Sequence, residues 1–384
     1  MQIEPLELDQ LRRLTGVKWT RDGDGVLPAW VADMDIRPPA CVIDALTDLV
    51  GRGDLGYSWR PQHLLPEVFA AWQKERHGWS PDPGDVRPFC DVLHAIDVAL
   101  WLLTEPGDGV VLLTPIYPPF IRAVSGSGRR IVEVPLDPDG WRLDPERLRA
   151  AIDDGTRALL ICNPHNPTGR VFDDDELEAI ARVAVEHDLL LLSDEVWADL
   201  LHPGAVHRPM ALVGDDVAAR TITITSASKA FNLAGLRCAV AHVGHHPLAD
   251  AIAELPSHVL GAVGTPGAEA AVAAWSEGGP WLAALRTHLT QRRDQLARRL
   301  ADDLPGVGWQ LPESTYLAWL DLGAYGLGDD PGAELLRRAS VSLSSGPTFG
   351  SQGDGFVRLN YATSAEILDL IVDRLVDALA GTDR

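Results

Sequence analysis

The chain has 384 residues, of which 46% are hydrophobic, and its formal net charge is −22 at pH 7. This length and composition predict a compact fold of one large or two moderate domains. The strong negative charge opposes contact with a phosphate backbone, so it argues against a nucleic-acid partner.

The sequence carries no pattern typical of export, membrane insertion or metal binding. Its start, MQIEPLELDQ, is acidic and lacks an apolar run, and no stretch reaches the ~18 consecutive apolar residues of a membrane span. The four cysteines are scattered without a CxxC pair: Cys41, Cys90, Cys162 and Cys238. These features predict a cytoplasmic protein with reduced thiols and no metal site.

The middle of the sequence alternates short apolar runs with helical patterns. His94–Leu103 and Asp173–His187 have helical spacing, and Asp173–Asp175 supply the cap and first-turn charge of the second helix. Six apolar runs between turn residues predict strands: Val110–Thr114, Ile131–Val134, Ala158–Cys162, Leu189–Ser193, Thr221–Thr225 and Cys238–Val243. Apolar strands separated by helices predict a mainly parallel sheet between two layers of helices.

The last hundred residues mix strands and helices differently. Leu282–Leu304 predicts a long helix that could bridge two domains, and shorter elements follow it: strands Tyr316–Leu320 and Phe356–Asn360, and helices at Pro331–Ser340 and from Ser364. We therefore predict a large α/β domain over residues 40–280. Residues 1–39 and 281–384 would form a smaller α+β domain.

A lysine lies between hydroxyl groups and an arginine directly after the predicted strand 221–225. Ser226 and Ser228 flank the turn, Lys229 follows, and Arg237 lies eight residues further on. This set suits a phosphorylated aldehyde, because the amine forms a Schiff base while the hydroxyls and the guanidinium hold the phosphate. The chain has only three lysines, so each one merits attention. Alone, the motif favours this interpretation only modestly over a surface lysine in a Ser/Ala-rich loop.

Two further polar groups follow predicted strands. Asp194 ends the leucine-rich run of LLLLSDEVWADL, where a carboxylate could keep a pyridinium nitrogen protonated. Asn166 lies in CNPHNPTGRVF, whose Asn-Pro pairs and glycine fix an irregular turn that could aim the amide at a ring oxygen. Each alone could be a strand-end cap or a plain loop. Because all three motifs follow parallel strands, we expect Asn166, Asp194 and Lys229 to converge at one sheet edge.

These motifs together resemble those of the fold type I pyridoxal-phosphate (PLP) enzymes of the class I/II aminotransferase superfamily. Within it, the chain resembles the MalY/PatB-type cystathionine β-lyases, or C–S lyases. The branch resemblance rests on five segments: WVADMDIRPP (30–39), GYSWRP (56–61), TPIYPPF (114–120), CNPHNPTG (162–169) and SASKAFNLAGLR (226–237). It implies a PLP fold type I architecture, with a mainly parallel sheet sandwiched by helices in the large domain.

The resemblance also implies roles at the cofactor ring. Lys229 is the Schiff-base lysine and acid/base, Asp194 pairs with the pyridine nitrogen, Asn166 bonds the ring hydroxyl, and Tyr117 stacks on the ring face. Asn166 would also border the substrate. Seen without the resemblance, Tyr117 would be a core residue beside two prolines.

The remaining implied contacts concern the phosphate, the substrate and a second subunit. The phosphate is held by Ser226, Ser228 and Arg237, together with backbone N–H groups near Val92 and Leu93 at a helix N-terminus. Tyr57 reaches the phosphate of the neighbouring subunit, which implies a homodimer with shared active sites. Arg358 binds the substrate α-carboxylate as a bidentate fork.

Three positions depart from the family pattern. Trp197 stands where these lyases usually carry His, and its indole could reshape the substrate pocket. Asp91 replaces a small residue beside the phosphate, where a carboxylate would cap the helix or, if turned inward, repel the phosphate. Arg60 in GYSWRP is either a substrate contact or structural.

The resemblance favours a PLP-dependent β-lyase that cleaves cystathionine or a cysteine S-conjugate to thiol, pyruvate and ammonia. An aminotransferase would use the same residues, so it stays an alternative. Another is a specialised-metabolism enzyme for a bulky S-cysteinyl conjugate, with elimination or decarboxylation. A ligand-sensing regulator is the alternative of a different class, although no helix-turn-helix extension supports DNA binding.

Overall fold

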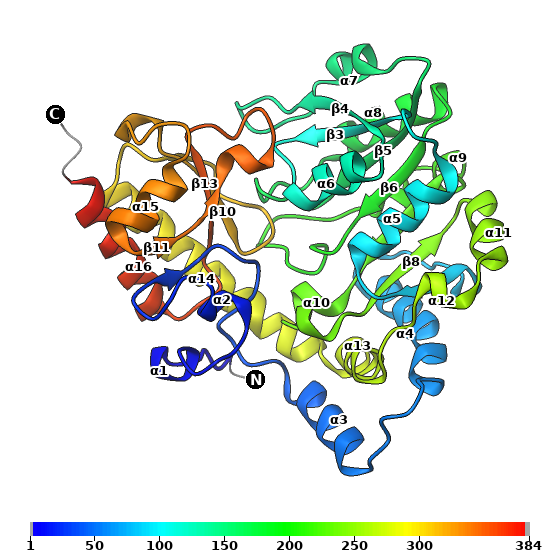
Figure 1. Cartoon of the computed structure of the whole chain (residues 1–384), viewed down its shortest axis with the longest axis horizontal. Helices are drawn as coiled ribbons and strands as arrows, with labels where there is room; N and C mark the ends of the chain where they lie inside the picture. The colour runs from blue at the N-terminus through cyan, green and yellow to red at the C-terminus, as the bar shows by residue number, and fades with distance from the viewer. Residues whose placement is uncertain (1–2, 381–384) are drawn as a thin grey trace.

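Two sheets organise the protein, whose computed structural model describes residues 3–380 (Figure 1). The larger sheet has seven strands in the order β2-β8-β7-β6-β5-β3-β4. These strands are β2 (Val86–Phe89), β3 (Gly109–Thr114), β4 (Arg130–Pro135), β5 (Thr156–Cys162), β6 (Leu190–Asp194), β7 (Thr221–Thr225) and β8 (Ala239–Val243). The strands β3 to β7 are parallel, whereas β8 runs antiparallel to both of its neighbours. The predicted, mainly parallel sheet is therefore confirmed.

All six strands predicted for the larger sheet exist, and of its seven strands only the edge strand β2 was not predicted. Its sequence, VRPF, is short and contains a proline, which is tolerated at an edge because that strand needs fewer ladder hydrogen bonds. The sheet continues one strand beyond the predicted set and ends in an antiparallel pair.

Alternate side chains of the sheet enter two hydrophobic clusters on its opposite faces. Along β3, Val110 and Leu112 join one cluster while Val111 and Leu113 join the other. The first face is covered by α5 (Val92–Leu103) and the second by α8 (Asp174–Glu186), both close to their predicted bounds. Covering both faces explains why these strands read as continuous apolar runs.

The C-terminal part contains a four-stranded antiparallel sheet in the order β12-β13-β10-β9. The elements of this part of the chain are β9 (Gly308–Trp309), β10 (Leu317–Asp321), α15 (Pro331–Ala339), β11 (Val341–Ser342), β12 (Ser344–Ser345), β13 (Phe356–Asn360) and α16 (Ala365–Leu379). The long helix α14 (Gly279–Asp303) contacts α13 (Thr265–Glu277), and the C-terminal half of α14 contacts α16 (Figure 1). The predicted elements of this region are confirmed, while the exact domain bounds stay a prediction.

The remaining helices surround these sheets. They are α1 (Leu8–Leu11), α2 (Val17–Thr20), α3 (Ala40–Gly51), α4 (Arg60–His77), α6 (Pro118–Gly126), α7 (Pro145–Ala151), α9 (Asp215–Ala218), α10 (Ala227–Ala230), α11 (His246–Glu254) and α12 (Ser257–Leu260). Within the described part, no helix is long and apolar enough to cross a membrane.

The segment 30–36 is fixed between the two sheets. Asn360 Nδ2 donates to the carbonyls of Val31 (2.8 Å) and Asp33 (2.7 Å), and the Met34 N–H donates to Asn232 Oδ1 (2.9 Å). A buried ion pair between Lys18 and Asp35 (2.9 Å) adds an anchor. β1 (Leu27–Pro28) also pairs with β11, so this N-terminal stretch belongs structurally beside the C-terminal sheet.

Candidate active site

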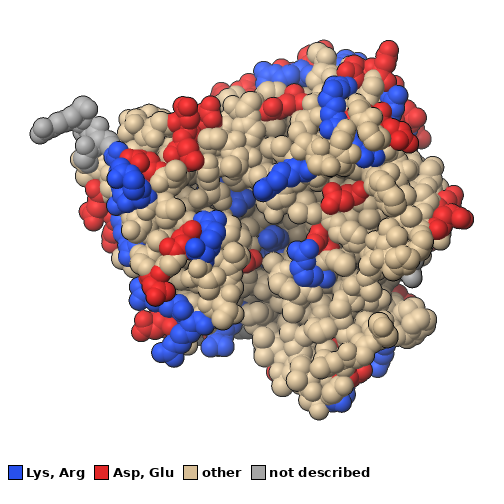
Figure 2. Space-filling model, viewed as in Figure 1, with Lys and Arg blue, Asp and Glu red and all other residues tan. Residues whose placement is uncertain are grey.

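A cavity of about 660 Å³ opens where β5, β6 and β7 end. Its lining contains most of the sequence-predicted site residues: Asp91, Val92, Leu93, Tyr117, Asn166, Asp194, Trp197, Ser226, Ser228, Lys229, Arg237 and Arg358. The expected convergence of the three strand-end motifs is therefore confirmed. Figure 2 shows basic side chains gathered around the hollow in the middle of this face.

Lys229 lies within α10, just after β7, and its amine points to the N-terminal segment. Lys229 Nζ donates to the Ala32 carbonyl at 3.0 Å, and Tyr316 Oη donates to the same oxygen at 2.8 Å. Burial lowers the pKa of Lys229, because a charged amine loses hydration in this enclosed place. A lysine with this environment is more easily deprotonated, as imine formation and proton transfer both require.

Asp194 is the last residue of β6 and is almost completely buried. Its Oδ1 accepts a hydrogen bond from the Val196 N–H (3.1 Å), and its Oδ2 accepts one from Cys162 Sγ (3.4 Å). Burial raises the pKa of Asp194 to about 7, and the neighbouring charge of Glu195 acts in the same direction. A buried carboxyl of this kind is ready to gain stability from a cationic ring nitrogen beside it.

Asn166 and Arg358 meet from the two sheets. Arg358 Nη1 donates to Asn166 Oδ1 at 2.8 Å. Because a guanidinium can only donate, the amide oxygen must face Arg358, and Asn166 Nδ2 is left as a donor beside the cavity. The Nδ2 atom makes no hydrogen bond to another residue of the described chain, which suits the predicted bond to a ring oxygen.

Arg358 is a buried cation that lacks a carboxylate partner among residues 3–380. Its Nη2 donates to the Trp30 carbonyl (2.9 Å) and to Ser344 Oγ (3.2 Å), while its Nε is buried without a partner. Burial lowers the pKa of Arg358 to about 10. An uncompensated guanidinium at a cavity wall is suited to binding an anion, most simply a carboxylate.

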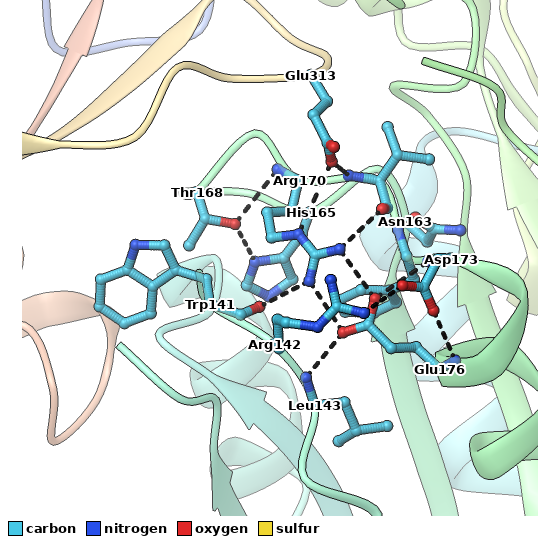
Figure 3. Close-up of polar contacts among 12 residues, drawn as sticks. Trp141, Arg142, Leu143, Asn163, His165, Thr168, Arg170, Asp173, Glu176 and Glu313 are labelled. Carbon is cyan, nitrogen blue, oxygen red and sulfur yellow. Dashed lines mark hydrogen bonds and ion pairs between the residues drawn. The ribbon is translucent and has the colours of Figure 1, made fainter. Parts of the chain in front are cut away.

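A buried polar network holds the turn that carries Asn166 (Figure 3). Arg170 donates from Nη1 and Nη2 to the two carboxylate oxygens of Glu176, each at 2.9 Å, and thus ties the turn to α8. Glu313 lies on the other side of this guanidinium, 3.7 Å from Nε, and accepts from the Val171 N–H at 2.8 Å. The network fixes the turn, and the turn fixes the Asn166 amide.

Two residues inside the same turn explain its shape. His165 has its pKa lowered to about 3 by burial, so the ring is neutral; it contacts the Leu113 carbonyl through Nε2 (3.4 Å) and Thr168 Oγ1 through Nδ1 (2.9 Å). Gly169 has φ +71°, and a Cβ there would lie 2.4 Å from Pro312 Cβ. Only glycine fits this position without moving the neighbouring backbone.

The N-terminus of α5 forms the second polar end of the cavity. Asp91 caps this helix, since its Oδ1 accepts from the His94 N–H at 2.8 Å, and its Oδ2 pairs with Arg237. The first-turn N–H groups of Val92 and Leu93 have no acceptor within the helix, as at every helix start. Asp91 therefore caps the helix with one oxygen, while its other oxygen contacts Arg237 in the lining of the cavity.

The two serines of the lysine motif differ in whether their hydroxyl groups are free to bind a ligand. Ser226 Oγ donates to the Cys238 carbonyl at 2.5 Å and accepts from the Ser228 N–H at 3.0 Å, so it caps α10. Its hydroxyl proton is already used by the protein. The Ser228 hydroxyl, by contrast, makes no hydrogen bond to any residue of the described range and is the better candidate for an anion.

Trp197 is buried beside the lysine. Its ring packs edge-to-face against Tyr316, with centroids 4.9 Å apart, and the ring centroid lies 5.8 Å from Lys229 Nζ. Tyr117, the N-cap residue of α6, and Val196 also line the cavity. The indole thus forms part of the cavity wall near Lys229, while its effect on the substrate pocket stays a prediction.

Tyr57 and Arg60 lie away from the cavity of their own chain. The Tyr57 side chain is fully exposed, next to Leu55 and Trp59, which are also exposed. Arg60 begins α4 at the surface. Tyr57 therefore does not line the cavity of its own chain.

Sequence reasoning missed several residues of the site. Ala32 acts through its carbonyl, and Tyr316, Val196 and Cys162 act through contacts with predicted residues. The WVADMD motif was the available signal for Ala32, since it marks the N-terminal segment whose backbone contacts Lys229. Among the described residues, no group of three His, Cys, Asp or Glu side chains is arranged to hold a metal ion.

Comparisons with known proteins agree with this geometry. The model of the family described as aminotransferase class I and II matches residues 37–375, so the chain belongs to that family. It is 36% identical to cystathionine β-lyase PatB of Bacillus subtilis, covering 95% of this chain and 96% of PatB. It is 32% identical to the protein MalY of Escherichia coli, covering 92% of each.

Solved structures give the same result. Cystalysin from Treponema denticola, described as containing a pyridoxal 5′-phosphate cofactor, superposes with a TM-score of 0.91 at 29% identity and covers 99% of both chains. Within the family, the chain lies in the MalY/PatB-like cystathionine β-lyase branch. The predicted resemblance and fold class are thereby confirmed.

Proposed function

We propose that this protein is a PLP-dependent carbon–sulfur β-lyase that cleaves cystathionine or a cysteine S-conjugate to a thiol, pyruvate and ammonia. The observation that carries the proposal is the joint geometry of Lys229, Asp194 and Arg358 around one cavity in a chain of the MalY/PatB-like branch. A reactive amine, a buried carboxyl and an anion-binding guanidinium are the groups that this chemistry needs.

The chain's free polar groups fit pyridoxal 5′-phosphate. Lys229 would hold its aldehyde carbon, Asp194 its ring nitrogen and the Nδ2 of Asn166 its ring oxygen. Tyr117 and Val196 would enclose the ring. At the other end, Arg237, Ser228 and the first N–H groups of α5 would hold the phosphate. Ser226 would cap this turn instead of binding the phosphate directly, because its hydroxyl donates a hydrogen bond to the Cys238 carbonyl.

Each protein group has a separate task in the reaction. Arg358 clamps the substrate α-carboxylate, and its bond to Asn166 couples substrate position to ring position. Once the substrate amine has displaced Lys229 from the aldehyde carbon, the freed Lys229 Nζ removes the proton from the substrate Cα. When bound, PLP supplies an electron sink for the charge that develops there. The Cβ–S bond breaks with its electron pair on sulfur, the thiolate is protonated, and the remaining enamine takes up water to give pyruvate and ammonium.

The Ala32 carbonyl gives the lysine a defined resting place. This oxygen accepts hydrogen bonds from both Lys229 Nζ and Tyr316 Oη. The amine is thus held by a neutral carbonyl, which is too weak a base to take a proton from it. A free amine kept there remains close to the cavity and can act as a base.

We also propose a homodimer in which Tyr57 completes the phosphate site of the neighbouring subunit. Its full exposure supports this, and so does the exposure of Leu55 and Trp59, because a cluster of exposed hydrophobic side chains on one segment is typical of an interface. Sedimentation should give twice 41.5 kDa, and Tyr57→Phe should weaken PLP binding. A monomer with full activity would contradict the proposal.

The decisive experiment is incubation with L-cystathionine and several S-substituted cysteines without any keto acid, with pyruvate and free thiol assayed. We expect both products in equal amounts. Lys229→Ala should abolish them and also the internal-imine absorbance, whereas Lys74→Ala, an exposed lysine on α4, should behave like the wild type. No pyruvate from any substrate would exclude the lyase.

An aminotransferase is the second candidate, since the family whose model matches the chain is named for that activity. The same residues serve both reactions when the substrate lacks a leaving group on Cβ. Amino transfer that depends on an added keto acid, with no thiol released, would favour this candidate over the lyase.

A further inference from the structure

We propose that the Asp91 carboxylate lowers the affinity of this protein for pyridoxal 5′-phosphate, because it places a negative charge beside the phosphate site. The inference rests on the cofactor contacts proposed above. It concerns binding only, and not the substrate or the reaction.

The position of Asp91 is tightly defined. Its Oδ1 accepts from the His94 N–H at 2.8 Å, and its Oδ2 pairs with an Nη2 donor of Arg237. Both residues line the cavity, together with Ser228. The carboxylate thus engages the arginine that would hold the phosphate, and it stands at the same helix N-terminus.

The negative charge of Asp91 contributes to the pKa shifts of two neighbouring groups. The pKa of Asp97 is raised by burial and, secondly, by the negative charge of Asp91. The pKa of Tyr117, which also lines the cavity, is raised mainly by burial, with a smaller contribution of the same sign from Asp91. Of the facing groups, Arg237 compensates this charge, but its side chain is 65% exposed and well hydrated.

A bound phosphate would have to share Arg237 with Asp91. The guanidinium has further donors for the phosphate, so binding is not blocked. A carboxylate and a phosphate dianion on one guanidinium nevertheless repel each other. For charges on the order of 6 Å apart in a water-like dielectric, this repulsion corresponds to about tenfold in Kd.

The test compares variants that remove the charge but keep the helix cap. Asn and Ser both accept from an N3 N–H group, so Asp91→Asn and Asp91→Ser should preserve α5. Thermal unfolding of the cofactor-free variants serves as the check on folding. PLP is titrated into each protein by absorbance, and pyridoxal, which lacks the phosphate, is titrated in parallel.

We expect both variants to bind PLP about tenfold more tightly than the wild type and to lose it more slowly on dialysis. The Kd for pyridoxal should change less than twofold. Weaker PLP binding would show that Asp91 positions Arg237, and would overturn the proposal. Equal tightening for both ligands would overturn it as well. If wild-type protein formed no Lys229-dependent imine with PLP, the cofactor assignment itself would fail, which is a different result.

Discussion

The protein contains two buried groups of charges that are built in opposite ways. Around Arg170, the guanidinium meets the Glu176 carboxylate with two bonds of 2.9 Å, and Glu313 lies beside it (Figure 3). Around the cavity, Arg358 has carbonyl, amide and hydroxyl partners only, and its Nε has none. A buried guanidinium that is paired with a carboxylate is a compensated charge. A buried guanidinium without a carboxylate partner is an uncompensated charge, and it is stabilised when an anionic ligand binds. The contrast separates a structural network from a binding site.

The largest expected effect is on stability, at the compensated cluster. Arg170→Met should lower the free energy of unfolding by about 3–5 kcal/mol, because Glu176 would be left buried without a cation. Neutralising both partners, as Arg170→Met with Glu176→Gln, should recover part of this loss, because the amide oxygen of Gln can still accept from the Leu143 N–H, as Glu176 Oε1 does at 2.8 Å. Urea unfolding of the cofactor-free proteins measures both. A single variant as stable as the wild type would show that the pair is not a compensated charge cluster.

The uncompensated arginine should behave in the reverse manner. Arg358→Met should reduce kcat/KM for an amino-acid substrate by about 10²–10³, since the α-carboxylate loses a charge-assisted fork, while the cofactor-free protein is at least as stable as before. Arg358→Lys should recover little activity, because an ammonium cannot reproduce the fork. Steady-state kinetics beside urea unfolding test this, and a strong loss of stability would place Arg358 with the structural charges.

A smaller effect concerns the pH dependence of stability through Asp194. Its folded-state pKa is about 7, above the usual value of an unfolded aspartate near 4. Between these values the folded state holds a proton that the unfolded state releases, so the free energy of unfolding falls as pH rises from about 4 to 7. Above pH 7 the penalty is complete.

Asp194→Asn removes this titration. Without cofactor, the free energy of unfolding of the variant, relative to that of the wild type, should rise by about 2.5 kcal/mol between pH 5 and pH 8. Urea midpoints at the two pH values, each converted with its measured slope, give the comparison. A difference that did not change with pH, or changed in the opposite direction, would mean that Asp194 is already ionised at pH 5.

Local patterns were sufficient for the framework of the site. The runs before Asn166 and Asp194 are apolar, and the run before Lys229 alternates threonine with isoleucine, so all three predict strands. Parallel strands in one sheet bring their carboxyl ends to one edge. The same reasoning could not assign β2, because its proline and its short length hide it. It predicted Ser226 as a phosphate ligand without showing that the same hydroxyl caps α10; the phosphate contact stays a prediction.

The sequence by itself determined which residue types stand at the ends of three neighbouring strands, and hence that an amine, a carboxyl and an amide would meet. Only the tertiary structure decided how each is used. The Ala32 carbonyl reaches Lys229 across 197 positions, Arg358 joins Asn166 across 192, and Asp91 turns to Arg237 across 146. Such contacts depend on the packing of the two sheets and of the N-terminal segment, because local spacing carries no information on which distant groups will remain unpaired.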